Sequence, residues 1–129
     1  MSYTISVTID LPVPVAVERV KQALGEQGFG TLTEIDLQTT MKEKLDVDVE
    51  PYVILGACNP QLAHRALEAD RSIGALLPCN VVVRADGERT VVDALDPSVM
   101  STLSSGLDAV ATEASARIEA MLTSLSDDA

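Results

Sequence analysis

The chain has 129 residues, the length of one ordinary domain. Its 20 acidic and 9 basic residues give a net charge of −11, which argues against a nucleic-acid partner and against docking on anionic membranes. Hydrophobic residues make up 47% of the chain, which excludes intrinsic disorder. We therefore expect a single compact domain over residues 1–129. No segment approaches the roughly 20 apolar residues of a membrane helix, and the N-terminus does not resemble a signal peptide, so the expected location is cytoplasmic.

The acidic residues have a distinctive composition. Eleven of the 20 are Asp, and only three of the 9 basic residues are Lys. Two interpretations fit this pattern: a halophilic host with a salty cytoplasm, or an acidic surface tuned for ordinary solubility. Thermal unfolding in increasing KCl distinguishes them, because a melting temperature that molar salt leaves unchanged or lowers excludes the halophilic host.

Hydrophobic periodicity predicts five strands and four helical segments. Alternating or continuous apolar residues place the strands at residues 3–9, 31–38, 50–58, 79–85 and 88–95. Helical spacing places the helices at residues 15–24, 39–48, 59–70 and 96–128. The strand at 50–58 is apolar on both faces, which predicts a central position in the sheet.

Local signals mark where several of these segments begin and turn. Asn59 and Pro60 are typical N-cap and first-position residues for the helix at 59–70, and Thr39 or Thr40 is the expected cap of the short helix. An Asp-Gly pair at residues 86–87 predicts a hairpin. Five strands with three larger helices predict an α/β (α+β) fold, a two-layer sandwich with a mixed sheet.

The C-terminal quarter of the chain reads as a helical tail. Asp96 is its expected cap, Pro97 its expected first residue, and Gly106 a candidate break. Its apolar stripe is long for a chain of this size, so we expect it to pack on the sheet or on a partner, and a symmetric homodimer is predicted. The stripe consists of Val99, Leu103, Leu107, Val110, Ala114, Ile118, Met121, Leu122 and Leu125.

One region contains both cysteines and the only histidine. Cys58 ends a predicted strand directly before the Asn59 cap, so its sulfur is expected beside a helix N-terminus, which favours a thiolate. His64 lies in the second turn of the same helix, and Cys79 opens the next strand. Gly56 allows close backbone approach to this site. Asn59, Pro60, Pro78 and Asn80 are the other expected supporting residues.

Less specific interpretations of these residues remain open. Cysteine is a common buried residue, and a lone helical histidine is more often exposed or structural than a ligand. The spacing Cys-x5-His is no established zinc pattern, and Cys58, His64 and Cys79 supply only three ligands. A soft metal such as Cu(I), or an open zinc site, is chemically admissible. Met100 is a candidate thioether ligand, although core packing is its commoner role.

The segment PYVILGACNPQLAHRALEADRSIGALLPCNVVV resembles the hallmark segment of the family called domain of unknown function 302. The resemblance extends downstream to VDALDPSVM and upstream to EIDLQTTMKEKL, and so covers nearly the whole chain. It implies a small α/β fold, members that are often dimers, and no established reaction. The acidic surface departs from the Lys-rich surface often found in the family. The family pattern matches Gly56, Cys58, Asn59, Pro60, Ala63, Gly74, Leu77, Pro78, Cys79, Asn80, Asp96 and Pro97.

Three functions are consistent with the sequence. The first is a small binding module in which Cys58, His64 and Cys79 hold a soft metal ion, copper or zinc, or a metal-containing cofactor such as haem; an aromatic content of 2% argues against haem. The second is thiol chemistry, with Cys58 as nucleophile, His64 as general base and Cys79 as resolving thiol. The third is a dimeric interaction domain with inert cysteines. An enzyme is the less favoured class, because no wider acid–base network accompanies the histidine.

Overall fold

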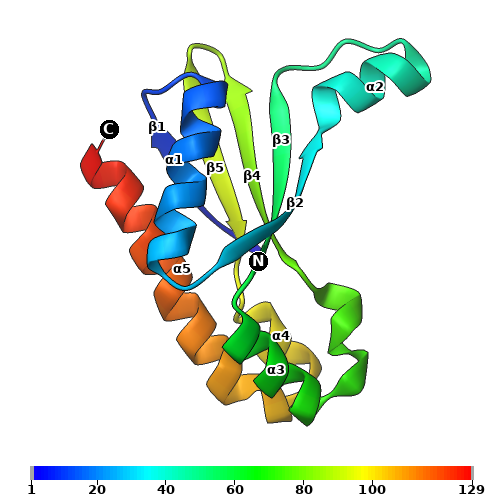
Figure 1. The fold of residues 1–129 in the computed structure, drawn as a ribbon, viewed down its shortest axis with the longest axis vertical. Helices are drawn as coiled ribbons and strands as arrows, with labels where there is room; N and C mark the ends of the chain where they lie inside the picture. The colour runs from blue at the N-terminus through cyan, green and yellow to red at the C-terminus, as the bar shows by residue number, and fades with distance from the viewer. Residues whose placement is uncertain (1, 129) are drawn as a thin grey trace.

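The structure, a computed structural model, describes residues 2–128, with side chains through residue 126. Its elements in chain order are β1 (Thr4–Ile9), α1 (Val13–Glu26), β2 (Gly30–Asp36), α2 (Leu37–Leu45), β3 (Tyr52–Cys58), α3 (Pro60–Ala69), the 3-10 helix η1 (Arg71–Leu76), β4 (Cys79–Asp86), β5 (Arg89–Leu95), α4 (Val99–Leu103), the 3-10 helix η2 (Ser105–Leu107) and α5 (Asp108–Asp128). Figure 1 shows α1 and α5 side by side over one face of the sheet, with α3 and α4 below its lower end.

The five strands form one sheet in the order β1-β5-β4-β3-β2. The predicted five strands and the α/β two-layer sandwich are confirmed. The expectation of mixed pairing is wrong, because all four neighbouring pairs are antiparallel. The β1–α1–β2 connection does join two strands of the same direction, but they form opposite edges of the sheet. Strand β3 is interior, as its apolar faces predict, while β4 occupies the centre.

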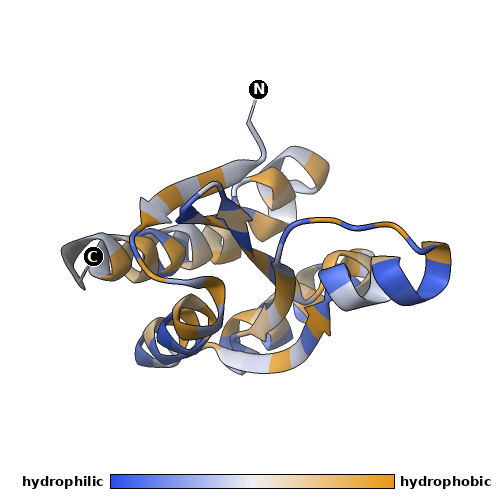
Figure 2. Cartoon of the chain, turned by 90° about the horizontal axis from the view of Figure 1, so that it is seen from above, coloured by the Kyte–Doolittle hydropathy of each residue, from blue (hydrophilic) through white to orange (hydrophobic). Residues whose placement is uncertain are grey.

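Two groups of buried side chains stabilise the fold. The larger lies between the sheet and helices α1 and α5, and includes Leu24, Leu55 and Ile118. The smaller lies beyond the end of the sheet, where α3, η1, α4 and α5 meet, and includes Ile73 and Leu107. Figure 2 shows hydrophobic residues along the strands and along the helix faces turned toward them. Helix α5 contributes to both groups, which explains the length of its apolar stripe.

The predicted helical tail is confirmed in part. The predicted start is wrong, because α4 begins at Val99 after Ser98, so Asp96 is not its cap and Pro97 is not its first residue. Asp96 instead accepts a hydrogen bond from the Ser98 N–H at 2.9 Å in the turn before the helix. The single long helix is wrong, because the chain breaks at Ser104 and passes through η2 before α5 begins. The break lies next to Gly106, the residue expected to permit it. Leu103 of the predicted stripe is 62% exposed, since it lies before the break and outside the phase of α5.

Two local predictions differ in detail from the structure. Helix α2 begins at Leu37, because the carboxylate of Asp36 accepts a hydrogen bond from the Thr39 N–H at 3.0 Å and acts as the cap in place of Thr39 or Thr40. The β4–β5 hairpin exists, but its two-residue turn is Gly87-Glu88, since Asp86 pairs with Arg89. Gly87 has a φ of 62°, a conformation that favours glycine at the first turn position.

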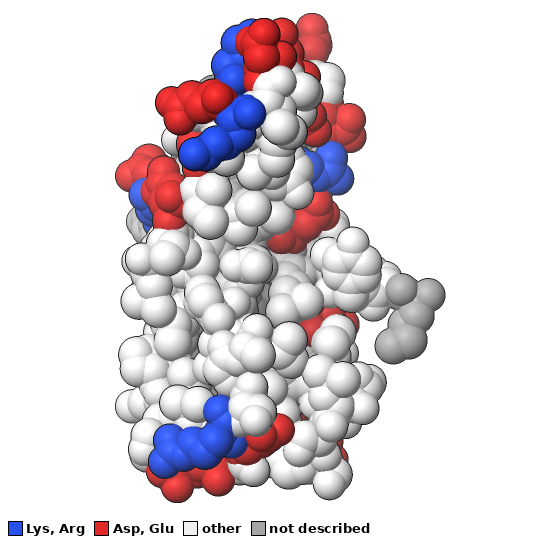
Figure 3. All heavy atoms as spheres, turned by 90° about the vertical axis from the view of Figure 1, so that its right-hand side faces the viewer, with Lys and Arg blue, Asp and Glu red and all other residues white. Residues whose placement is uncertain are grey.

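Charge and exposed apolar area are unevenly distributed over the surface. Figure 1 shows α2 projecting away from the helices that cover the sheet, and none of the α2 residues is buried. On the side of the molecule that carries α2, Figure 3 shows charged side chains gathered at both ends and mostly uncharged side chains between them. Within the described residues, no helix is long and apolar enough to cross a membrane.

Candidate functional site

Strands β3 and β4 bring the two cysteines to the same end of the sheet. The chain leaves β3 after Cys58, passes through α3 and η1, and returns as β4 at Cys79. In the β3–β4 register Ala57 lies opposite Cys79, so Cys58 is one residue beyond the residue that faces Cys79. This neighbourhood depends on the antiparallel pairing of β3 with β4, which the sequence alone did not establish.

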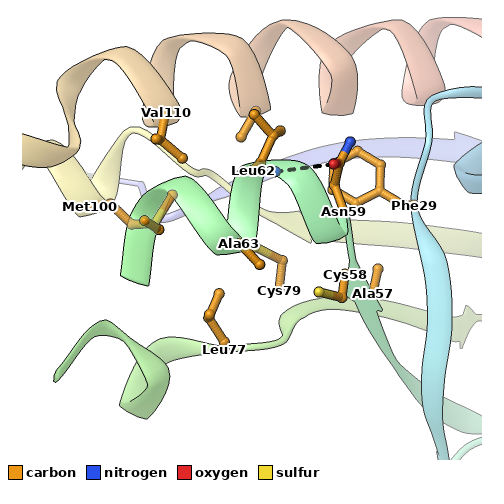
Figure 4. A pocket seen from close by; sticks show the side chains of 12 residues that line it. Phe29, Ala57, Cys58, Asn59, Leu62, Ala63, Leu77, Cys79, Met100 and Val110 are labelled. Atoms are coloured by element: carbon orange, nitrogen blue, oxygen red, sulfur yellow. Dashed lines mark hydrogen bonds between the residues drawn. The ribbon is translucent and has the colours of Figure 1, made fainter. Parts of the chain in front are cut away.

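Both cysteines line a pocket beneath α3 (Figure 4). Apart from the two thiols and the Asn59 amide, the lining side chains are apolar or a thioether. The cavity volume is about 30 Å³. This is enough for a single ion or one water molecule. The lining residues are Phe29, Ala57, Cys58, Asn59, Leu62, Ala63, Ala66, Leu77, Cys79, Met100, Val110 and Ala114.

The pocket changes the acidity of Cys79. Burial raises the pKa of the Cys79 thiol above its ordinary value, and the nearby Cys58 raises it further. An apolar environment disfavours the charged thiolate, which is the physical cause of the first effect. Cys79 therefore stays protonated at neutral pH unless a cation or a reaction removes its proton.

The raised pKa of Cys79 makes stability depend on alkaline pH. The protonated thiol stabilises the native state fully below about pH 8.5, the ordinary pKa of an unfolded cysteine. That contribution is lost as the pH rises through the higher folded-state pKa, because the unfolded chain releases the proton more readily. Urea unfolding of the wild type and of Cys79→Ala, at about pH 8 and about pH 10, should show the wild type losing its advantage over the variant. A stability difference that is independent of pH would contradict this prediction.

Asn59 fixes the position of α3 over the pocket. Its side chain, 9% exposed, accepts a hydrogen bond from the Leu62 N–H at 3.2 Å and is the predicted N-cap. Pro60 follows at the first helical position, also as predicted. The Asn59 amide nitrogen packs against Gly28, whose φ of 85° places the α1–β2 turn beside the cap. The cap thereby ties the start of α3 to the opposite side of the pocket.

Loss of this cap should be measurable as lost stability. Asn59→Ala removes the acceptor for the Leu62 N–H and is expected to lower the free energy of unfolding by about 1 kcal/mol. Asn80→Ala is the matched control, because Asn80 is exposed and the change should stay within about 0.5 kcal/mol. Equal unfolding midpoints in urea for Asn59→Ala and the wild type would show that the cap does not contribute.

Of the other supporting residues predicted from the sequence, Gly56 and Pro78 pack against each other beside Cys79, whereas Asn80 lies away from the cysteine pocket. Gly56 lies where β2 and the segment entering β4 approach β3 most closely. A Cβ there would be 2.2 Å from Thr33 Oγ1 and 2.8 Å from Pro78 Cγ. Pro78, after a cis Leu77–Pro78 peptide, packs on Gly56 and leads directly into Cys79. Asn80 lies opposite Gly56 and lines a separate hollow with Tyr3 and other residues, so it does not contact the cysteine pocket.

His64 does not join the cysteines. Its side chain is 74% exposed, and its Nε2 lies 3.3 Å from Glu68 Oε1 on the outer face of α3. It is absent from the pocket lining, where the inward residues of α3 are Leu62, Ala63 and Ala66. Among the residues whose side chains are described, no three His, Cys, Asp or Glu groups are arranged to hold a metal ion. The structure therefore supports a two-cysteine site and gives no role to His64 as a ligand or general base.

Among the other lining residues, only Met100 is a candidate ligand in the sequence. Met100, 6% exposed, reaches the pocket from α4, and Phe29 and Val110 come from other elements. Figure 4 shows Met100 toward the other end of α3 from Cys58. An apolar residue distant in sequence gives no local signal that it lines a pocket, and Met100 stands out in the sequence only because a thioether can bind a soft metal.

Fold and site together define a small antiparallel α/β sandwich with a pocket at one end of its sheet that is lined by two partly buried cysteines. The chain matches the family model described as "Domain of unknown function DUF302" over residues 5–125, and it belongs to that family, which confirms the resemblance. It is similar to the crystal structure of an uncharacterized conserved protein DUF302 from Bacillus stearothermophilus. The two are 27% identical, with 97% of this chain and 99% of that chain covered and a TM-score of 0.90. No curated protein matches.

Proposed function

We propose that this protein is a binding module that holds one soft metal ion, Cu(I), between the thiolates of Cys58 and Cys79. The observation that supports it is the presence of both thiols of the chain in one small, largely apolar pocket. Thiolate sulfur is a soft ligand that selects Cu(I) over hard cations. Carboxylates, which would favour Mg²⁺ or Ca²⁺, are absent from the lining.

The donor set favours copper over the other metal groups that the sequence admits. Structural zinc is held by four ligands, and catalytic zinc by three. Two cysteines without His64 fall short of both, whereas Cu(I) accepts a low coordination number. Haem would need an axial ligand and room for a planar ring, while the pocket has space for about one small ion. The site therefore fits a single ion better than a cofactor.

Charge balance also favours a monovalent soft cation. The apolar lining raises the pKa of Cys79 and so disfavours an uncompensated thiolate. A bound cation offsets the cost of forming the thiolate, because it stabilises the deprotonated form of its ligands. Two thiolates and one Cu(I) have a net charge of −1, which costs less to place in an apolar pocket than the two negative charges of free thiolates. Binding releases the thiol protons, so affinity should increase with pH.

A competition titration tests the proposal. Fully reduced protein is titrated anaerobically with Cu(I) in the presence of a coloured Cu(I) chelator, and the loss of chelator colour reports transfer to the protein. We expect one Cu(I) per chain, together with ultraviolet absorption from sulfur-to-copper charge transfer. Chelator colour that is unaffected by the protein would refute metal binding at this site.

A homodimer is a further part of the proposal. Strand β2 is an edge of the sheet, and exposed apolar side chains follow it into α2 and beyond: Leu32 is 65% exposed, Ile35 45% and Leu45 66%. An unpaired edge strand that carries exposed apolar side chains can pair with a second copy of the chain. Light scattering of the wild type should give the mass of a dimer, and Ile35→Glu should give a monomer. A monomeric wild type at high micromolar concentration would exclude this interface.

A further inference from the structure

The two cysteines occupy positions from which they can bond to each other. Residues directly opposite each other in an antiparallel pair have Cα atoms about 4.5–5.5 Å apart, and a strand advances about 3.4 Å per residue. Cys58 is one step beyond the partner of Cys79, so their Cα atoms are about 6 Å apart, within the range of disulfides. In a regular strand, residues one step out of register point to opposite faces. Here β3 ends at Cys58 and the chain turns into α3, so both side chains line the same pocket.

We infer that Cys58 and Cys79 form a reversible intramolecular disulfide by exchange with a small aliphatic disulfide, and that this disulfide closes the metal site. The second half of the inference rests on the proposed Cu(I) binding; the first half does not. In the dithiol form both sulfurs are available to a metal. In the disulfide form neither sulfur is a thiolate, so the pocket has no soft anionic ligand.

The exchange proceeds through a mixed disulfide. The Cys58 thiol loses its proton and its sulfur attacks one sulfur of the small disulfide RSSR. The S–S bond of RSSR breaks, and RS⁻ leaves and takes up a proton as RSH. Cys79 then loses its proton and attacks the Cys58 sulfur, which forms the Cys58–Cys79 bond and releases the second RSH. The protein is oxidised by two electrons, RSSR is reduced to two RSH, and no other reactant is needed.

The order of the two steps follows from the surroundings of each thiol. Cys58 is partly exposed at the end of β3, where the chain turns into α3, so a small disulfide can reach its sulfur. Cys79 lines the same pocket one residue out of register with Cys58, so its sulfur lies beside the mixed disulfide once that has formed. His64 takes no part, since its side chain faces solvent on the other side of α3.

The bond would also constrain the part of the chain that covers the pocket. Helix α3 and η1 lie between Cys58 and Cys79, so the disulfide closes a loop around both elements. A crosslink of this kind stabilises chiefly by restricting the unfolded chain. The oxidised protein should therefore melt at a higher temperature than the reduced protein.

The test uses oxidised glutathione as the small disulfide and intact mass as the readout. Each wild-type chain should lose two hydrogen atoms in mass, lose both reactive thiols, retain no glutathione and recover on reduction. Cys79→Ser should instead retain one glutathione on Cys58, because it has no resolving thiol. A wild type that keeps two free thiols, retains glutathione or forms only disulfides between chains would overturn the inference.

A Cu(I) titration of the reduced and the oxidised protein tests this inference separately from the proposed function. Reduced and oxidised wild type are titrated with Cu(I) as above, without added thiol. At least a 100-fold weaker competition by the oxidised form supports closure of the site, and equal competition overturns it. If the reduced protein fails to bind Cu(I) while the internal disulfide forms, the proposed function fails and the disulfide exchange stands.

Discussion

Gly56→Ala is expected to cause the largest loss of stability of any alanine substitution proposed for this chain. The added Cβ would lie 2.2 Å from Thr33 Oγ1 and 2.8 Å from Pro78 Cγ, both well inside van der Waals contact. Relief of both contacts needs a different Thr33 side-chain rotamer and a shift of the Pro78 ring, which leads into β4. Overpacking of this kind costs about 3 kcal/mol, and urea unfolding measures it.

Two further variants make the Gly56 prediction specific. Gly25→Ala is the matched control, because no atom lies within 4 Å of its Cβ position and alanine favours the helix α1; it should stabilise by up to about 1 kcal/mol. Combining Gly56→Ala with Thr33→Ala removes the closer clash and should restore part of the stability. If Gly56→Ala alone has the same free energy of unfolding as the wild type, β2 and Pro78 leave enough space for a Cβ at residue 56, and the prediction is wrong.

Cys58→Ser and Cys79→Ser should each abolish effective competition for Cu(I). Substitutions that only support a ligand cost about 10–100-fold in affinity, so loss of one of two ligands should cost at least about 100-fold. His64→Ala is the control, because its exposed imidazole lies outside the pocket and the affinity should not change. The competition titration with reduced protein measures all three variants.

The same variants distinguish the site from inert cysteines. If the cysteines only fill space, Cys58→Ser lowers the free energy of unfolding, and the wild type competes for Cu(I) no better than the variant. If His64→Ala weakens binding as much as Cys58→Ser does, the ion is held outside the pocket and the two-cysteine site is wrong.

Local features of this fold could be predicted from the sequence because each depends on a few neighbouring residues. The Asn59 cap with Pro60 was predicted correctly, since an acceptor side chain and a missing N–H act within one turn. The hairpin after β4 was placed one residue early, because an Asp-Gly pair and a Gly-Glu pair both fit a two-residue turn there. Asp36 replaced Thr39 as a cap because β2 ends two residues earlier than its alternation suggests.

Long-range features could not be derived in this way. Whether Cys58 and Cys79 approach each other depends on which strand β3 pairs with, and no local pattern encodes that choice. The direction of His64 depends on the phase of α3, which is set by the packing of Leu62 and Ala66 against the smaller core. A shift of one residue along α3 decides the outcome, because Ala63 lines the pocket and His64, the next residue, faces solvent.

X-ray absorption at the copper edge of the Cu(I)-loaded, reduced protein tests the two-cysteine site most directly. Ligation by Cys58 and Cys79 predicts a first shell of sulfur neighbours only, which Cys58→Ser alters and His64→Ala leaves unchanged. A first shell that contains imidazole nitrogen would contradict it, because the only histidine of the chain lies on the outer face of α3.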